Sequence, residues 1–493
     1  MTSYLLSIDQ GTSSCRAVIF NDRGGVEVIF QRGFSLIYPQ TGWVEQNPSD
    51  ILEGTIWAIQ ECAKYCREKG LKIAAAGLTN QRETTILWDR KTGQPVYNAI
   101  VWQDRRTASL CADLRGTGIE EQVRRNTGLM LDPYFSVTKI RWILDNVEGA
   151  RERAACGEIC FGTVDSFLIW HLTNGQNHAT DVTNASRTML YNIAKNEWDR
   201  KFIDLSDING NIIPRAQGCV SDFGQIKTEF FDQNIRILGV AGDQHAALIG
   251  QGCITSGMIK ITYGTGCFAL MNIGDDLRLS QNRLLTTIGY HVDKNPIYAL
   301  EGSIFNAGTA IQFLRDNLGL IETAAQTHDI AESLSGTEGV YFVPAFTGLG
   351  APYWDPDARG VICGLDRHTS KAHIIRAALE AQGYQTRDLI AAMEADAGQA
   401  IKTIRADGGL AANEFMGQFL ADITQRPVEI PSVTEATAWG AACLAGIGAG
   451  VFQNLGETAA LWRLGRRYEP KRPAAEMDAL YAGWQRAVNK TYT

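Results

Sequence analysis

Short apolar runs separated by polar turns open the chain. Residues 4–8 and 17–20 are apolar, and residues 26–30 supply a third run after the turn-forming residues 21–25. Runs of this length, bounded by glycine, asparagine and aspartate, are typical of strands joined as hairpins. The sequence therefore predicts an antiparallel meander, with residues 9–14 as the polar loop between its first two strands.

A helical pattern follows this meander. Asn47 before Pro48 is typical of a helix start, because proline lacks the amide hydrogen that the first helical residue does not need. The next apolar residues recur at helical spacing: Leu52, Ile56, Ile59 and Ala63. After Gly70, residues 73–78 return to a strand pattern. This alternation continues along the chain and favours an α/β fold with helices covering mixed sheets.

A strand end followed by a Gly-Thr pair occurs twice. Gly11-Thr12 follows the first apolar run, and Gly264-Thr265 follows a similar run just past the middle of the chain. A short internal repeat of this kind indicates two similar α/β halves that face each other across a ligand cleft. We expect an N-terminal domain over residues 1–249 and a C-terminal domain over residues 250–493.

Composition narrows the class of protein. The 493 residues are 45% hydrophobic and 20% charged, which is typical of a globular protein with more than one core. The net charge of -8 and the scattered lysines and arginines argue against a nucleic-acid partner. No stretch approaches the roughly 20 apolar residues of a membrane helix, and no signal peptide precedes the first strand. We expect a cytoplasmic protein, with its eleven cysteines reduced.

Three glycine loops are candidates for binding a polyphosphate. In the first, Gly11 lets the backbone approach closely, and Thr12, Ser13 and Ser14 offer hydroxyl and amide donors. Residues 262–266 and 405–409 repeat the arrangement after strand-like stretches. One loop of this kind is more often an ordinary polar turn. Three together favour a nucleotide site, in which Asp9 would hold Mg²⁺ through water.

Asp243 is the candidate base. It follows the apolar residues 237–240 on a glycine turn, and phosphoryl transfer to an alcohol needs a carboxylate near the attacking hydroxyl group. The alternative is a helix-capping aspartate. His245, two residues later, is more typical of a packing residue and receives no role.

A polyol pocket is suggested by polar and aromatic side chains in the first half. Arg82 and Glu83 follow a strand and can donate and accept hydrogen bonds with vicinal hydroxyl groups, although a surface ion pair is an alternative. Trp102 and Tyr134 are residue types that pack against the carbon face of a polyol, and core packing is their alternative.

Together these motifs resemble the FGGY family of carbohydrate kinases over nearly the whole chain. The resemblance is carried by residues 9–14, 77–85, 98–103, 181–189, 263–268 and 344–354. It implies an actin-like ATPase fold of two ribonuclease-H-like domains with the ligand cleft between them. The implied activity is ATP- and Mg²⁺-dependent phosphorylation of glycerol to sn-glycerol 3-phosphate, by a homodimer or homotetramer.

The resemblance also implies roles for individual residues. Asp243 would be the general base and, with Asp9, would hold the metal. The polyol pocket would contain Arg82, Glu83, Trp102, Tyr134, Asp243, Gln244 and Phe268. The nucleotide would be bound by Thr12, Ser13, Ser14 and Arg16 on one side, and by Thr265, Gly308, Gln312, Gly409 and Asn413 on the other.

Two helices are expected around the second half of this site. Apolar residues at helical spacing predict a buried stripe that leaves Gly308 and Gln312 one turn apart at its edge: Ile304, Ala307, Ile311, Leu314 and Leu318. Residues 432–435 are typical of a capping box that opens a small-residue helix running through Gly446.

Other functions share parts of this pattern. A kinase of another small polyol or ketose is the nearest alternative function. An actin-like filament protein or a chaperone ATPase would share the nucleotide loops but would not need a polyol pocket beside Asp243.

Residues 221–240 lack the glycine- and lysine-rich loop that binds fructose 1,6-bisphosphate in some bacterial relatives, and residues 467–477 do not match the surface bound by a phosphocarrier. Neither form of regulation is expected.

Overall fold

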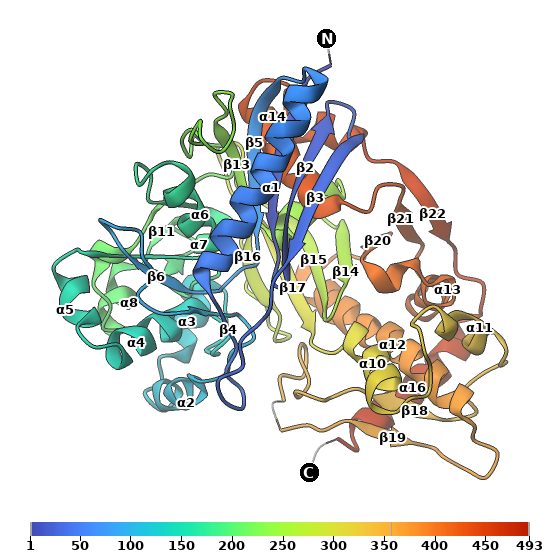
Figure 1. Cartoon of the computed structure of the whole chain (residues 1–493). Coiled ribbons are helices and arrows are strands. Elements are labelled where there is room, and N and C mark those ends of the chain that lie inside the picture. Colours follow the sequence, from blue (N-terminus) through green and yellow to red (C-terminus); the bar gives the residue numbers. More distant parts are fainter. Residues whose placement is uncertain (1, 356, 492–493) are drawn as a thin grey trace.

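The computed structural model describes residues 2–355 and 357–491, and its first large sheet contains the predicted meander (Figure 1). The strand order is β13-β5-β1-β2-β3. β1 pairs antiparallel with β2, and β2 with β3, whereas β5 and β13 run parallel to β1. The meander is confirmed. The strands are β1 (Tyr4–Gln10), β2 (Ser14–Asn21), β3 (Val26–Gly33), β5 (Ile73–Asn80) and β13 (Ile237–Gly242).

The second large sheet repeats this arrangement. Its order is β16-β17-β15-β14-β20-β21-β22, and its five inner strands have the directions of the first sheet with β14 in the place of β1. Both Gly-Thr pairs lie in the turn between the first two strands of their sheet. The strands are β14 (Ile259–Tyr263), β15 (Cys267–Gly274), β16 (Leu285–Tyr290), β17 (Ile297–Ile304), β20 (Ile404–Asp407), β21 (Val428–Pro431) and β22 (Leu464–Tyr468).

A long helix packs on each sheet. α1 (Pro48–Lys69) lies over β2 and β3, and α12 (Lys371–Ala397) lies against β15 and β17 (Figure 1). α1 begins as the sequence predicts, because the side chain of Asn47 accepts the amide hydrogen of Ser49 at 3.0 Å. It ends at Gly70, whose φ of 65° is the left-handed conformation that glycine adopts without steric cost.

Helix α14 (Ala436–Gly448) belongs to the last part of the chain but packs against β1, β5 and β13 of the first sheet. It also packs tightly on α9 (Asp243–Gly250). A Cβ atom at Gly440 would lie 1.8 Å from the carbonyl oxygen of Ala246, and one at Gly77 would lie 2.1 Å from that of Ala441. Only glycine allows these approaches, so they fix the position of α9, which begins with Asp243.

Smaller elements surround the two sheets. Those inserted in the first half are β4 (Glu45–Gln46), β6 (Ile86–Asp89), β7 (Ala99–Ile100), α2 (Ala108–Gly116), α3 (Glu120–Thr127), α4 (Ser136–Asn146), α5 (Ala150–Ala155), β8 (Ile159–Gly162), α6 (Val164–Leu172), β9 (Ala179–Asp181), α7 (Val182–Ala185), β10 (Tyr191–Asn192), β11 (Glu197–Trp198), α8 (Arg200–Leu205), the 3-10 turn Gly210–Ile212 and β12 (Arg215–Gln217). Those in the second half are α10 (Gly308–Gln312), the π-helical turn Phe313–Asn317, α11 (Gln326–Glu332), β18 (Tyr341–Val343), β19 (Val361–Cys363), the 3-10 turn Gly409–Ala412, α13 (Glu414–Thr424), α15 (Leu455–Ala460) and α16 (Ala474–Val488). Among the described residues, no helix has the length and hydropathy that crossing a bilayer requires.

Two local predictions are wrong in detail. The apolar stripe is not one helix, because Ile304 ends strand β17, the helix changes to a π-helical turn after Gln312, and Leu318 is 43% exposed. The placing of Gly308 and Gln312 one turn apart on α10 is confirmed. The capping box at residues 432–435 does not form: Glu435 occupies the N-cap position without a side-chain capping bond and pairs with Arg16 instead.

Candidate active site

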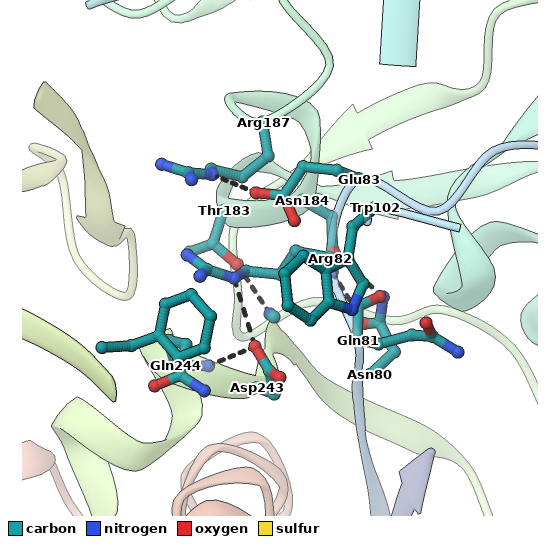
Figure 2. Close-up of polar contacts among 12 residues, drawn as sticks. Asn80, Gln81, Arg82, Glu83, Trp102, Thr183, Asn184, Arg187, Asp243 and Gln244 are labelled. Carbon is teal, nitrogen blue, oxygen red and sulfur yellow. Dashed lines mark hydrogen bonds and ion pairs between the residues drawn. The ribbon is translucent and has the colours of Figure 1, made fainter. Parts of the chain in front are cut away.

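Asp243 is the first residue of α9, directly after β13. Its Oδ1 atom accepts the amide hydrogen of Gln244 at 2.6 Å and lies 3.1 Å from Nε of Arg82 (Figure 2). Arg82 follows β5, the parallel neighbour of β13, so both side chains lie at the same edge of the sheet. The side chain of Asp243 is 27% exposed. The fold thus fixes one carboxylate that a small molecule can reach.

A chain of buried charges supports Asp243. The guanidinium of Arg82 donates to both carboxylate oxygens of Glu301, at 2.5 and 3.0 Å. Glu301 also accepts from Arg187 at 3.0 Å, and Nε of Arg187 donates to Glu83 at 2.6 Å. Arg82 and Glu83 are almost completely buried and do not pair with each other. The alternative of a surface ion pair is therefore wrong.

The pKa values of these buried side chains follow from burial and from the charges that face them. Burial raises the pKa of Asp243 above its ordinary value, and the cations of Arg82 and Lys260 oppose the increase. Burial also raises the pKa of Glu83, although the cations of Arg187 and Arg82 oppose the increase. Burial alone would raise the pKa of Glu301, but Arg187 and Arg82 hold it below its ordinary value. The pKa values of the two carboxylates that Arg82 touches are thus shifted in opposite directions, upward for Asp243 and downward for Glu301.

The backbone at Glu83 is strained. Its φ of 60° is in the left-handed region, which non-glycine residues seldom adopt and which costs of order 1–3 kcal/mol. The hydroxyl groups of Ser136 and Thr85 both donate to its carbonyl oxygen, at 3.0 and 3.1 Å. This conformation turns the Glu83 side chain toward Arg187 while Arg82 points toward Asp243 (Figure 2).

Three aromatic rings lie beside these charges. Trp102 makes edge contacts with Tyr134 and Phe268, with ring centroids 5.7 and 5.8 Å apart. The indole nitrogen of Trp102 donates to the hydroxyl group of Thr12 at 2.9 Å. The structure therefore brings the predicted pocket residues from both halves of the chain together, and it links them to the first glycine hairpin.

The first glycine hairpin is fixed by side chains around it. Arg16 on β2 lies 2.7 Å from Asp9 and 2.5 Å from Glu435, which precedes α14. The side-chain amide of Gln46 donates to the carbonyl oxygen of Thr12. Arg16 is thus occupied by two carboxylates, and its predicted contact with the nucleotide would compete with these ion pairs.

The predicted residues of the second half gather around the second hairpin. Gly308 donates its amide hydrogen to Gly264 at 3.0 Å, and a Cβ atom at Gly308 would lie 2.7 Å from that carbonyl oxygen. Thr265 lies in the same turn, where its carbonyl oxygen accepts from the backbone of Ala307 at 3.1 Å. Only glycine permits α10 to begin this close to the hairpin.

Gly409 and Asn413 lie in the third loop, after β20. A Cβ atom at Gly409 would meet no atom within 4 Å, so its backbone faces open space. Asn413 caps α13, where its Oδ1 accepts from Met416 at 3.2 Å, and its amide nitrogen donates to Thr327 at 3.0 Å.

Sequence reasoning assigned no role to four residues of this site. Glu301 and Lys260 are fully buried charges in otherwise apolar strands. A charged residue within an apolar strand is unusual, and this is the signal in the sequence that could have identified them as site residues. Arg187 and Thr183 lie within residues 181–189, which carry the family resemblance. Thr183 accepts the amide hydrogen of Gly242 at 2.9 Å, directly before Asp243.

The repeated sheets, the glycine hairpins and the supported carboxylate define a two-domain sugar kinase of the actin-like ATPase type. Two family models match the chain: the N-terminal domain of the FGGY family of carbohydrate kinases over residues 4–250, and its C-terminal domain over residues 259–449. The chain belongs to the FGGY family of carbohydrate kinases. This confirms the fold class and the family that the sequence indicates.

Individual relatives are similar over their full length. The chain is 54% identical to a glycerol kinase of Nitrosomonas eutropha, covering 98% of this chain and 97% of that protein. It is 52% identical to a glycerol kinase of a Marinomonas species, with both chains fully covered. Among solved structures, glycerol kinase of Plasmodium falciparum with ADP has a TM-score of 0.94 at 35% identity and covers 100% of this chain and 99% of that one.

Proposed function

We propose that this protein transfers the γ-phosphoryl group of ATP to a terminal hydroxyl group of glycerol, giving ADP and sn-glycerol 3-phosphate. The observation that carries the proposal is the reachable carboxylate of Asp243, which is held by Arg82 beside three aromatic rings and close to the glycine hairpins. The name glycerol kinase, shared by relatives 52–54% identical over at least 98% of the chain, supports glycerol as the acceptor.

Five side chains of the site would have a direct task in this reaction. The attacking hydroxyl group donates to Asp243, which takes its proton as the new oxygen–phosphorus bond forms and the bond to the ADP oxygen breaks. A raised pKa suits a carboxylate for this role. Arg82 donates to a second hydroxyl group and Glu83 accepts from one, while Trp102 and Phe268 cover the carbon chain.

ATP would lie between the two glycine hairpins, and Asp9 and Asp243 fit a magnesium ion there. No group of three or more His, Cys, Asp or Glu residues in the described ranges could hold a metal ion. Kinase magnesium sites need only one or two carboxylates, because phosphate oxygens and water complete the shell. The charge of Asp9 adds to the increase in the pKa of Asp243, so the two carboxylates are near enough to interact. The bound ion would offset charge on the phosphates.

The test is ADP release from ATP and Mg²⁺ with glycerol, erythritol, ribitol, xylulose or no acceptor, with the product identified. We expect turnover with glycerol alone. Asp243→Asn should abolish it and largely spare ATP binding, whereas Asp276→Asn, which changes an exposed aspartate, should not. Turnover only with a longer polyol or a ketose would refute glycerol as the substrate. Acceptor-independent hydrolysis would refute the kinase assignment.

We also propose that the enzyme works in the cytoplasm as a homodimer or homotetramer, and that its two domains divide near residues 249 and 250. These statements extend the family resemblance. Light scattering after gel filtration tests the oligomeric state, and a monomer at micromolar concentration would contradict it.

A further inference from the structure

Lys260 is a fully buried cation for which the proposed reaction has no task. It lies on β14, and its ammonium group donates to Oε1 of Gln244, to the hydroxyl group of Thr262 at 3.1 Å and to the carbonyl oxygen of Phe268 at 3.5 Å. A buried charge is costly unless its hydrogen bonds are satisfied. An ammonium group has three donors, and here three acceptors meet it. Two of them belong to residues of the predicted polyol pocket.

The contact with Lys260 determines which way the amide of Gln244 faces. An amide presents an oxygen acceptor on one side and a nitrogen donor on the other, and an ammonium group can only donate. The oxygen of Gln244 must therefore point toward Lys260. Its Nε2 atom lies on the side of Asp243 (Figure 2), and it has no hydrogen bond to any residue in the described ranges.

We propose that Lys260 is a positioning residue that sets the hydrogen-bond polarity of the polyol pocket, by turning the amide nitrogen of Gln244 outward as a donor beside the acceptor Asp243. A donor and an acceptor side by side match a hydroxyl group, which donates one hydrogen bond and accepts others. A carbonyl oxygen could use only the donor. This inference rests on the proposed function and explains how the site would prefer an alcohol to a carbonyl group.

The charge of Lys260 also acts on its neighbours. Burial lowers its pKa to about 8, and the carboxylates of Asp407 and Asp243 oppose the decrease. The cation in turn opposes the increase in the pKa of Asp243. Lys260 could therefore affect turnover in two ways, through the orientation of Gln244 or through charge alone, and an experiment has to separate them.

A double-mutant cycle separates the two effects. Lys260→Met keeps a long side chain without donors, and Gln244→Leu keeps the size of the side chain without an amide. We expect each single variant to raise the KM for glycerol roughly three- to tenfold, which corresponds to one hydrogen bond. The KM for ATP should change less than about twofold. In the Gln244→Leu background, Lys260→Met should add no further increase in the glycerol KM.

Three results would overturn the proposal. One is an equal effect of Lys260→Met in both backgrounds, because Lys260 would then act independently of Gln244. Another is an unchanged glycerol KM in folded Lys260→Met, checked by circular dichroism. The last is an unchanged glycerol KM in Gln244→Leu, which tests the outward donor even if Lys260→Met does not fold. The proposed function fails separately, because it requires glycerol-dependent turnover of the unaltered protein.

Discussion

Glu301→Gln tests the buried charge chain most directly. Glu301 is fully buried and accepts hydrogen bonds from both Arg82 and Arg187. The substitution keeps the shape of the side chain but removes the negative charge that these two buried arginines share. Removing one partner of a buried pair costs about 3–5 kcal/mol, and the retained amide oxygen places this change at about 3 kcal/mol.

This loss should be visible in thermal unfolding. At about 2.1 cal/mol/K per residue, a chain of 493 residues has an unfolding entropy of about 1 kcal/mol/K, so Tm should fall by about 3 °C. The glycerol KM should rise, because Arg82 is no longer held on two sides. Differential scanning calorimetry and the ADP-release assay measure the two effects.

The matched control is Glu121→Gln. Glu121 also accepts from two arginines, Arg124 and Arg125, but on an exposed helix face where solvent screens the charges. Its Tm and glycerol KM should match those of the unaltered protein. If Glu301→Gln behaves in the same way as Glu121→Gln, the buried chain does not support the site and the argument from charge balance is wrong.

Three further predictions follow from neighbouring features. Thr183→Val should lower kcat, because the buried amide of Gly242 loses its acceptor at a cost of about 1–3 kcal/mol, and Thr183→Ser should retain most of the activity; equal rates in both variants would contradict this role. Burial and the charge of Asp181 raise the pKa of Asp165 to about 7, so the folded state holds a proton that the unfolded state releases above about pH 4. The unfolding free energy should therefore fall as pH rises from about 4 to 7, and Asp165→Asn should lose less in urea midpoint between pH 5 and pH 8 than the unaltered protein. Gly440→Ala should lower both Tm and kcat, because its methyl group would lie 1.8 Å from the carbonyl oxygen of Ala246, whereas Gly116→Ala, with no atom within 4 Å, should change neither.

Local signals predicted the local structure well. The N-cap at Asn47 and the meander of β1 to β3 follow from residues a few positions apart, and both are confirmed. The capping box at residues 432–435 failed because a distant partner was stronger: Glu435 pairs with Arg16, far earlier in the chain. A rule that uses only neighbouring residues cannot include such competition.

The charge chain shows why the site was only partly predictable. Arg82 and Glu301 are 219 positions apart, and Glu83 and Arg187 are 104 apart. No periodicity connects residues at these separations, and only the fold brings them together. The motifs predicted the residues around Asp243, but they did not predict that the charges of Glu301, Arg187 and Lys260 support these residues.

The position of α14 has a consequence for the order in which the chain becomes structured during synthesis. The first sheet is complete in sequence once β13 has been made, yet one of its faces is covered by a helix that begins almost two hundred residues later. On the ribosome, a nascent chain that ends before residue 436 would carry β1, β5 and β13 with this face bare. The N-terminal half therefore reaches its final packing only when most of the protein has been translated, and chaperones would meet that apolar face in the interval.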